Sequence, residues 1–197
     1  MKNLKFSIGI FGGVFDPPHI GHLILAEWVR TEFKLDRIIF IPAFNPPHKN
    51  RFSSFKHRYE MTRRATKDNK KFFVSDIEKN IRGKTYTFEV IRALKKFYKK
   101  FNGAEIYLII GADQWQQIEH WQHPEIIFRE SKVIVLPRPG YNIIKTKLFI
   151  EKILFSNAPF IGISSTMIRE MVKKQMYINY LVTPEVLAYI KKNRLYV

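Results

Sequence analysis

Cysteine is absent from this 197-residue sequence. Its absence excludes disulfides and thiolate metal sites, and it gives no information on the redox compartment. No apolar run approaches the ~20 residues that a helix needs to cross a bilayer. The apolar run 6–11 is short, Asp16 follows it, and no small-residue cleavage site is evident. Low-complexity stretches and repeats are also missing. We therefore expect a cytoplasmic protein with no membrane partner, folded as a single domain over 1–197 with a helical C-terminal part from about residue 164.

Acidic residues are scarce. There are 17 of them against 34 Lys and Arg residues, which gives a net charge of +17. Such a charge fits a nucleic-acid binder, but it also fits a lysine-rich solvated surface that attracts small anionic substrates. The basic residues of segment 87–101 recur at helical spacing, opposite the apolar Val90, Ile91, Leu94 and Phe97. This pattern favours the solvated surface, and we expect no nucleic-acid partner.

Apolar, strand-like runs alternate with helix-like runs along the chain. Strands are predicted at 6–11, 37–42, 72–75, 105–110, 133–136 and 160–163, and helices at 20–33, 57–67, 87–101, 165–173 and 184–192. This alternation predicts an α/β fold: a doubly wound, Rossmann-like parallel sheet of five to six strands with helices on both faces. In such sheets ligands bind beyond the carboxyl ends of the strands.

The segment 12–22, Gly-Gly-Val-Phe-Asp-Pro-Pro-His-Ile-Gly-His, joins the first predicted strand to the first predicted helix. A helix start presents unpaired N–H groups to anions, and neutral imidazoles can donate hydrogen bonds to phosphate oxygens. His19 and His22 fall on one side of the first turn, and Gly21 would let a ligand approach the backbone closely. Asp16 either caps the helix or contacts the ligand. The segment predicts a nucleotide phosphate site.

A second group of polar residues opens the helix predicted at 165–173. Ser164, Ser165 and Thr166 supply hydroxyls, and Arg169 lies one turn further on the same face. Hydroxyls, helix N–H groups and a guanidinium together suit a polyphosphate. The alternative is an ordinary helix cap beside a surface arginine.

Three further features carry a functional and a structural interpretation each. Asp113, in Gly111-Ala112-Asp113 after a predicted strand, could accept from a ribose hydroxyl or cap a short helix. Trp121 could stack on a flat ring or belong to the core. Pro46-Pro47-His48-Lys49 is either a stiff loop with two donors or a surface turn.

These residues resemble those of bacterial nicotinate-nucleotide adenylyltransferases, members of the nucleotidyltransferase superfamily with a His-x-Gly-His signature. The likeness runs nearly end to end. It includes segments 12–22, 46–49, 85–87, 111–113, 138–140, 163–169, 180–182 and 195–196, together with Trp121. One departure is Val14, at a position where the family usually has Thr or Ser. A hydroxyl contact is lost there, while a backbone N–H contact would survive.

The resemblance implies transfer of AMP from ATP to nicotinate mononucleotide, which yields nicotinate adenine dinucleotide (deamido-NAD) and pyrophosphate in NAD biosynthesis. It assigns catalysis to His19, His22 and Arg169. ATP would be bound by Gly12, Gly13, Val14, Phe15, His19, His22, Gly111, Asp113, Ser164, Ser165, Thr166 and Arg169. Nicotinate mononucleotide would be bound by Phe15, His48, Lys49, Thr85, Tyr86 and Trp121. Mg²⁺ would be carried by the ATP phosphates, with no metal ligand from the protein.

Other functions share parts of this pattern. Nicotinamide mononucleotide or another phosphorylated acceptor would suit the same chemistry. Pantetheine-phosphate and cytidylyl transferases use the same histidine signature, but the segments 46–49 and 85–87 argue against both. Class I aminoacyl-tRNA synthetases also carry His-x-Gly-His and bind RNA. However, this chain has no Lys-Met-Ser-Lys-Ser-like loop and no appended RNA-binding domain. The oligomeric state is open, a homo-oligomer included.

Overall fold

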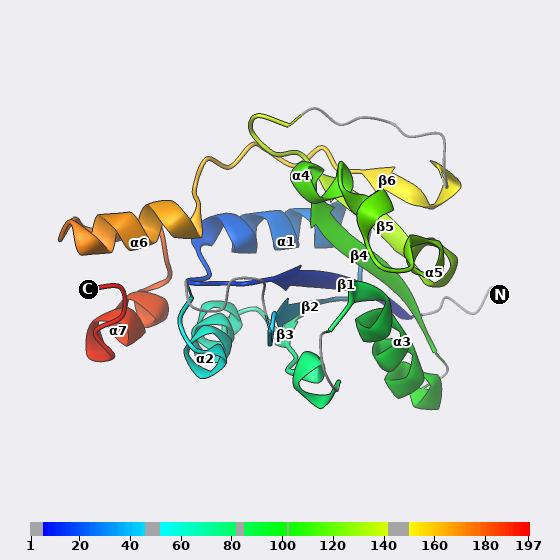
Figure 1. The fold of residues 1–197 in the computed structure, drawn as a ribbon, viewed down its shortest axis with the longest axis horizontal. Helices are drawn as coiled ribbons and strands as arrows, with labels where there is room; N and C mark the ends of the chain where they lie inside the picture. Colours follow the sequence, from blue (N-terminus) through cyan, green and yellow to red (C-terminus); the bar gives the residue numbers. More distant parts are fainter. Residues whose placement is uncertain (1–5, 46–51, 82–84, 102, 142–149) are drawn as a thin grey trace.

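A computed structural model describes residues 6–45, 52–81, 85–101, 103–141 and 150–197. Its centre is a sheet of six parallel strands (Figure 1). The strands are β1 (Phe6–Gly13), β2 (Arg37–Pro42), β3 (Phe72–Val74), β4 (Ala104–Gly111), β5 (Lys132–Leu136) and β6 (Ile153–Phe155).

The strand order is β3-β2-β1-β4-β5-β6. The sequence runs outward from β1 in one direction and then, after a crossover, outward from β4 in the other, so the order switches between these two neighbours. Both central strands are continuously apolar and buried from residue 8 to 11 and from 106 to 110, as expected where helices cover both faces. Gly9 allows tight packing here, because a Cβ atom would lie 2.6 Å from the Ile38 side chain.

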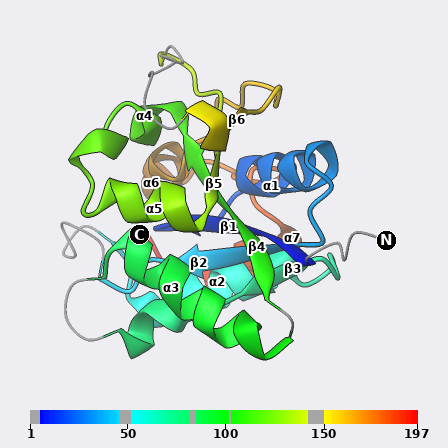
Figure 2. The same cartoon turned by 90° about the vertical axis from the view of Figure 1, so that its right-hand side faces the viewer.

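Helices cover both faces of the sheet, with α1 on one side and α3 and α5 on the other (Figure 2). The α-helices are α1 (Ile20–Glu32), α2 (Phe55–Thr66), α3 (Thr87–Tyr98), α4 (Ala112–Trp115), α5 (Pro124–Glu130), α6 (Ser165–Lys173) and α7 (Pro184–Lys192). Short 3₁₀ helices are η2 (Ile77–Asn80), η3 (Lys99–Phe101), η4 (Ile118–His120) and η5 (Ile150–Lys152).

The two C-terminal helices pack against α2 rather than on the sheet. Met61 of α2, Ile168 of α6, and Val186 and Ile190 of α7 form a buried apolar cluster of their own. In Figure 1, α6 and α7 lie beyond the tip of the β1 arrow, at the carboxyl end of that strand. The cluster therefore holds α6 beside the end of the sheet where the predicted motifs gather.

The predicted fold class is confirmed, but its details need correction. The sixth strand is β6 (Ile153–Phe155), not 160–163, because Ile153 and Phe155 pair in parallel with Val133 and Val135 of β5. Segment 160–163 is irregular, and Phe160 is 68% exposed. Phe97, predicted on the apolar side of α3, is also exposed. Within the described ranges, no helix combines the length and apolarity needed to cross a bilayer.

Candidate active site

A cavity of about 560 Å³ opens at the carboxyl ends of β1, β4 and β5. It lies where the strand order switches, the position at which doubly wound sheets bind ligands. Every residue predicted to bind ATP lines it: Gly12, Gly13, Val14, Phe15, His19, His22, Gly111, Asp113, Ser164, Ser165, Thr166 and Arg169. Segments about 150 residues apart in the sequence thus meet around one space.

The two histidines lie side by side at the start of α1. Their ring centroids are 3.7 Å apart, and His19 is the N-cap residue. The His19 backbone N–H donates to Nδ1 of His22 at 3.1 Å. Because Nδ1 accepts this bond, the proton of the neutral His22 ring is on Nε2, which makes Nε2 a donor for an oxygen in the cavity.

Both imidazoles are neutral at physiological pH. Burial lowers the pKa of His19 to about 4. Burial also lowers the pKa of His22 well below its ordinary value, with smaller electrostatic contributions from the neighbouring His19 and Arg138. A neutral imidazole can still donate a hydrogen bond to a phosphate oxygen.

The depressed pKa of His19 makes stability depend on pH. The unfolded chain binds a proton near pH 6.5, while the folded chain does so only near pH 4. The stabilising contribution of the neutral His19 is therefore fully present above pH 6.5, and it is lost as the pH falls from 6.5 to about 4. We expect the free energy of unfolding to fall by about 2 kcal/mol more between pH 7 and pH 5 in the wild type than in His19→Asn. Urea denaturation at both pH values measures this difference, and equal pH dependence in the two proteins would contradict it.

The wall opposite the histidines is the start of α6. Ser164 caps this helix by accepting from the Met167 N–H at 3.1 Å. The Ser165 hydroxyl donates to the carbonyl of Pro17 at 2.7 Å. Arg169 donates to the carbonyl of Asp16 at 2.7 Å and to the Thr166 hydroxyl at 3.1 Å. The helix cap considered from the sequence is therefore present at Ser164, and Ser165, Thr166 and Arg169 lie beside it on the wall of the cavity.

The third wall comes from the ends of β4 and β5. Gly111 is glycine because a Cβ atom would lie 2.5 Å from the Asp113 carboxylate. Asp113 accepts from Arg138 at 2.7 Å through one oxygen. Arg138 lines the cavity and was missed as a site residue from the sequence. Its position two residues after the end of the strand predicted at 133–136 was the signal that could have found it.

Three buried side-chain atoms lack a hydrogen-bond partner in the described part of the chain. They are Nδ1 of His19, Oγ1 of Thr85 and Oδ1 of Asp113. Buried polar atoms are normally paired, so these three atoms are candidates for contacts with a bound substrate. All three belong to residues predicted to bind the substrates.

The residues predicted to bind nicotinate mononucleotide are brought together less completely than those predicted to bind ATP. Phe15 lines the cavity, whereas Thr85, Tyr86 and Trp121 do not. Trp121 packs against the core cluster beneath α3 and α5. The Tyr86 N–H donates to the Glu89 carboxylate at 3.0 Å within the cap of α3. His48 and Lys49 lie outside the described residues.

The structure decides two points in the segment 12–22. Of the two roles considered for Asp16, it does not take that of the helix cap, because His19 is the N-cap residue of α1; Asp16 is buried and accepts from the Ser53 N–H at 2.9 Å. The prediction for Gly21 was wrong. Gly21 is buried against protein rather than left open for a ligand: a Cβ atom there would lie 2.7 Å from Ile161 and 3.0 Å from the His19 ring. Gly12 is the open position, with nothing within 4 Å of its Cβ site.

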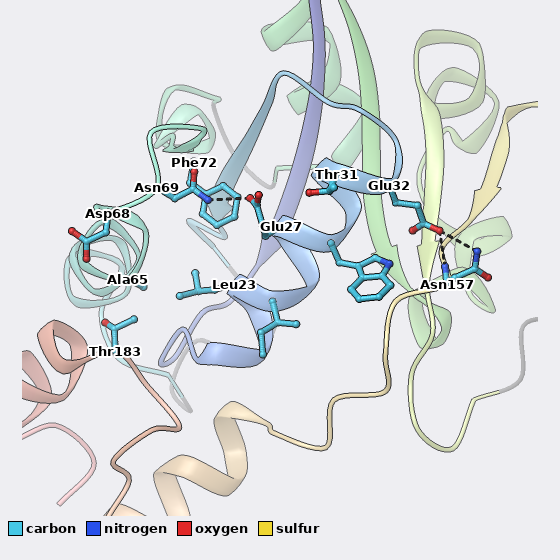
Figure 3. A pocket seen from close by; sticks show the side chains of 12 residues that line it. Leu23, Glu27, Thr31, Glu32, Ala65, Asp68, Asn69, Phe72, Asn157 and Thr183 are labelled. Atoms are coloured by element: carbon cyan, nitrogen blue, oxygen red, sulfur yellow. Dashed lines mark hydrogen bonds between the residues drawn. The ribbon is translucent and has the colours of Figure 1, made fainter.

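A second, larger cavity of about 950 Å³ lies on the outer side of α1 (Figure 3). On one wall Glu27 accepts from Asn69 at 3.0 Å, and on the other Glu32 accepts from the Asn157 N–H at 3.0 Å. Its floor includes the half-exposed Trp28. All the residues predicted to bind ATP line the smaller cavity instead, so we place the chemistry there.

Comparisons with known proteins agree with this geometry. A family model described as Cytidylyltransferase-like matches residues 10–171. A probable nicotinate-nucleotide adenylyltransferase of Desulfitobacterium hafniense (strain Y51) is 40% identical over 199 residues, covering 96% of this chain and 95% of that protein. Its counterpart in Thermoanaerobacter sp. (strain X514) is 42% identical over 202 residues, covering 98% and 95%. The chain belongs to the nicotinate-nucleotide adenylyltransferase family.

Solved structures of this family share the fold. The nicotinic acid mononucleotide adenylyltransferase of Plasmodium falciparum, complexed with NaAD, superposes with a TM-score of 0.74 at 22% identity, over 96% of this chain and 97% of that one. A putative nicotinate-nucleotide adenylyltransferase of Vibrio parahaemolyticus gives 0.68 at 20% identity, over 96% and 94%. These structures confirm the predicted fold, while the family model and the relatives that are about 40% identical confirm the family.

Proposed function

We propose that this chain transfers AMP from ATP to nicotinate mononucleotide, forming nicotinate adenine dinucleotide and releasing pyrophosphate. The observation that carries the proposal is the single cavity that brings the His19–His22 pair opposite Ser165, Thr166 and Arg169. Close relatives that are about 40% identical over nearly their full length carry the name of this activity.

The chemistry needs positioning and charge stabilisation rather than a protein base. A phosphate oxygen of the mononucleotide, already ionised at neutral pH, attacks the α-phosphorus of ATP. The bond from that phosphorus to the oxygen bridging to the β-phosphate breaks, and pyrophosphate leaves with the electron pair. In this proposal Nε2 of His22 donates to the α-phosphate, and Arg169 with the start of α6 holds the β- and γ-phosphates.

The ribose of ATP fits the end of β4. Oδ1 of Asp113 is buried and without a partner in the described structure, while Oδ2 is held by Arg138. An acceptor oriented in this way suits a ribose hydroxyl. Gly111 accommodates the Asp113 carboxylate, and the open Gly12 allows the substrate to approach the backbone.

Mg²⁺ enters this proposal as part of the substrate, on the phosphate oxygens of ATP. The described residues bring together no group of three or more His, Cys, Asp or Glu side chains that could hold a metal ion. Mg²⁺ commonly keeps several waters and binds through substrate phosphates, which suits such a site. The cytoplasmic location and the absence of a nucleic-acid partner stay predictions from the sequence.

The test is steady-state turnover with ATP and each mononucleotide. We expect kcat/KM for nicotinate mononucleotide to exceed that for nicotinamide mononucleotide by at least about tenfold, because a site matched to a carboxylate leaves a carboxamide poorly paired. CTP in place of ATP is the matched control for the nucleotide and should support little turnover. A preference for nicotinamide mononucleotide would contradict the proposed acceptor, and a preference for CTP would contradict ATP as the proposed nucleotide substrate.

A further inference from the structure

Tyr196, next to the last residue of the chain, contacts the segment 12–22 that carries the His-x-Gly-His signature (the signature segment). The hydroxyl of Tyr196 donates to Oδ1 of Asp16 at 2.7 Å, across 180 residues of sequence. Burial and the neighbouring Asp16 carboxylate raise the pKa of Tyr196. Its hydroxyl therefore stays protonated and remains a donor at physiological pH.

Asp16 is the centre of a larger set of contacts and is only 1% exposed. Its other carboxylate oxygen accepts from the Ser53 N–H at 2.9 Å. Its main-chain carbonyl accepts from Arg169 at 2.7 Å. The side chain and backbone of one residue thus join the signature segment to α6, to the segment before α2, and to the C-terminus.

A second buried side chain fixes the residue two positions earlier. Arg58 of α2 is 2% exposed, and it donates to the carbonyl of Val14 and to the carbonyl of Ser53, both at 2.9 Å. The guanidinium geometry lets one side chain hold both carbonyls. The contacts of Arg58 and Asp16 together hold the backbone in place on either side of Phe15.

Phe15 is the residue that needs this support. Its φ is 53°, in the left-handed region that a bulky side chain rarely adopts. Such a conformation persists where the surrounding contacts over-determine it. The buried Phe15 ring packs edge-on against the His22 imidazole, with centroids 5.0 Å apart. The conformation of the Phe15 backbone thus fixes the position of the Phe15 ring, which contacts His22.

We propose that Tyr196 is a positioning residue for the reaction: through Asp16 it holds the strained Phe15 backbone, and the Phe15 ring in turn aligns His22 with the α-phosphate. The C-terminal segment then belongs to the working site, although its tyrosine touches no substrate. The kinetic part rests on the proposed function, because it assumes that His22 donates to the reacting phosphate.

The test compares Tyr196→Phe with the matched control Tyr189→Phe. Both changes remove one hydroxyl from tyrosines packed against the α2–α6–α7 cluster, but the Tyr189 hydroxyl bonds to Nδ1 of His57 at 3.0 Å instead of to Asp16. We expect Tyr196→Phe to lower kcat about tenfold or more with KM for ATP nearly unchanged, since small misplacements of a catalytic group are costly. Tyr189→Phe should keep kcat within about twofold.

A double-mutant cycle separates positioning from general destabilisation. If Tyr196 acts through the Asp16 carboxylate, adding Tyr196→Phe to Asp16→Ala, which leaves no side-chain acceptor, should lower kcat little further, whereas independent effects would multiply. Assays are run below the Tm of every variant. Unchanged kcat in Tyr196→Phe, an equal loss in Tyr189→Phe, or multiplying effects in the cycle would each overturn the proposal.

A readout without turnover keeps this proposal distinct from the proposed function. The imidazole NMR signals of His22 should shift in Tyr196→Phe and stay in place in Tyr189→Phe, because the Phe15 ring moves only in the first. If the wild type fails to turn over nicotinate mononucleotide but the shift is seen, the function fails and the positioning role stands. No shift in Tyr196→Phe contradicts the positioning role whatever the activity.

Discussion

Replacing His22 with alanine is expected to lower kcat by at least a few hundredfold, with the fold intact. The loss corresponds to removing one donor that stabilises the transition state. The donor is identified by the structure: Nδ1 of His22 is occupied by the His19 N–H at 3.1 Å, so Nε2 carries the proton. Steady-state turnover of ATP with nicotinate mononucleotide measures the effect, with circular dichroism as the check on folding.

His123→Ala is the matched control for this experiment. His123 precedes α5, its side chain is 55% exposed, and it bonds to Glu125 rather than lining the cavity. Its replacement should leave kcat unchanged. Near-normal turnover in His22→Ala would contradict the mechanism, because no other group in this account donates to the α-phosphate in the same way.

The second large effect is expected on stability, at Arg58. Arg58→Met removes both hydrogen bonds to the carbonyls of Val14 and Ser53. It also removes the positive charge that faces the buried Asp16 carboxylate. We expect the free energy of unfolding to fall by about 3 kcal/mol, because two buried carbonyls lose their donor and a buried carboxylate loses a compensating charge. Guanidinium denaturation measures the difference.

Arg63→Met tests whether the effect belongs to the buried site. Arg63 lies on the same helix, but its side chain is 60% exposed and pairs only with Glu60 in the hydrogen bonds and ion pairs of the described residues. Exposed pairs contribute little, so its replacement should change the unfolding free energy by less than about 0.5 kcal/mol. Equal losses in the two variants would show that helix α2 as a whole, rather than the Arg58 contacts, is responsible.

The fold could be predicted from local patterns in the sequence, and the residues that line the candidate cavity were predicted from such patterns together with the family resemblance. Continuous apolar runs identified the buried parallel strands, and polar residues directly after them marked the cavity. Every residue predicted to bind ATP lies around that cavity. The helices 165–173 and 184–192 were predicted at their observed bounds, since hydroxyl caps and prolines mark their starts.

The errors arose where tertiary contacts outweigh local signals. The short edge strand β6 has only three residues and depends on pairing with β5. Arg58 sits in a helix with three other arginine or lysine residues, so nothing local distinguishes the buried one. The contact between Tyr196 and Asp16 spans 180 residues. The need for a glycine at position 21 comes from the close packing of Ile161, which belongs to a distant segment. Such contacts exist only once the chain has folded.

The central claim is that the mononucleotide phosphate attacks the α-phosphorus of ATP directly. The claim is tested by a reaction with one diastereomer of ATP that carries sulfur on its α-phosphorus, with the configuration of the dinucleotide product read by ³¹P NMR. Direct attack is a single displacement and predicts inversion at the α-phosphorus. Retention of configuration, or an adenylylated histidine isolated from the enzyme after incubation with ATP alone, would contradict it.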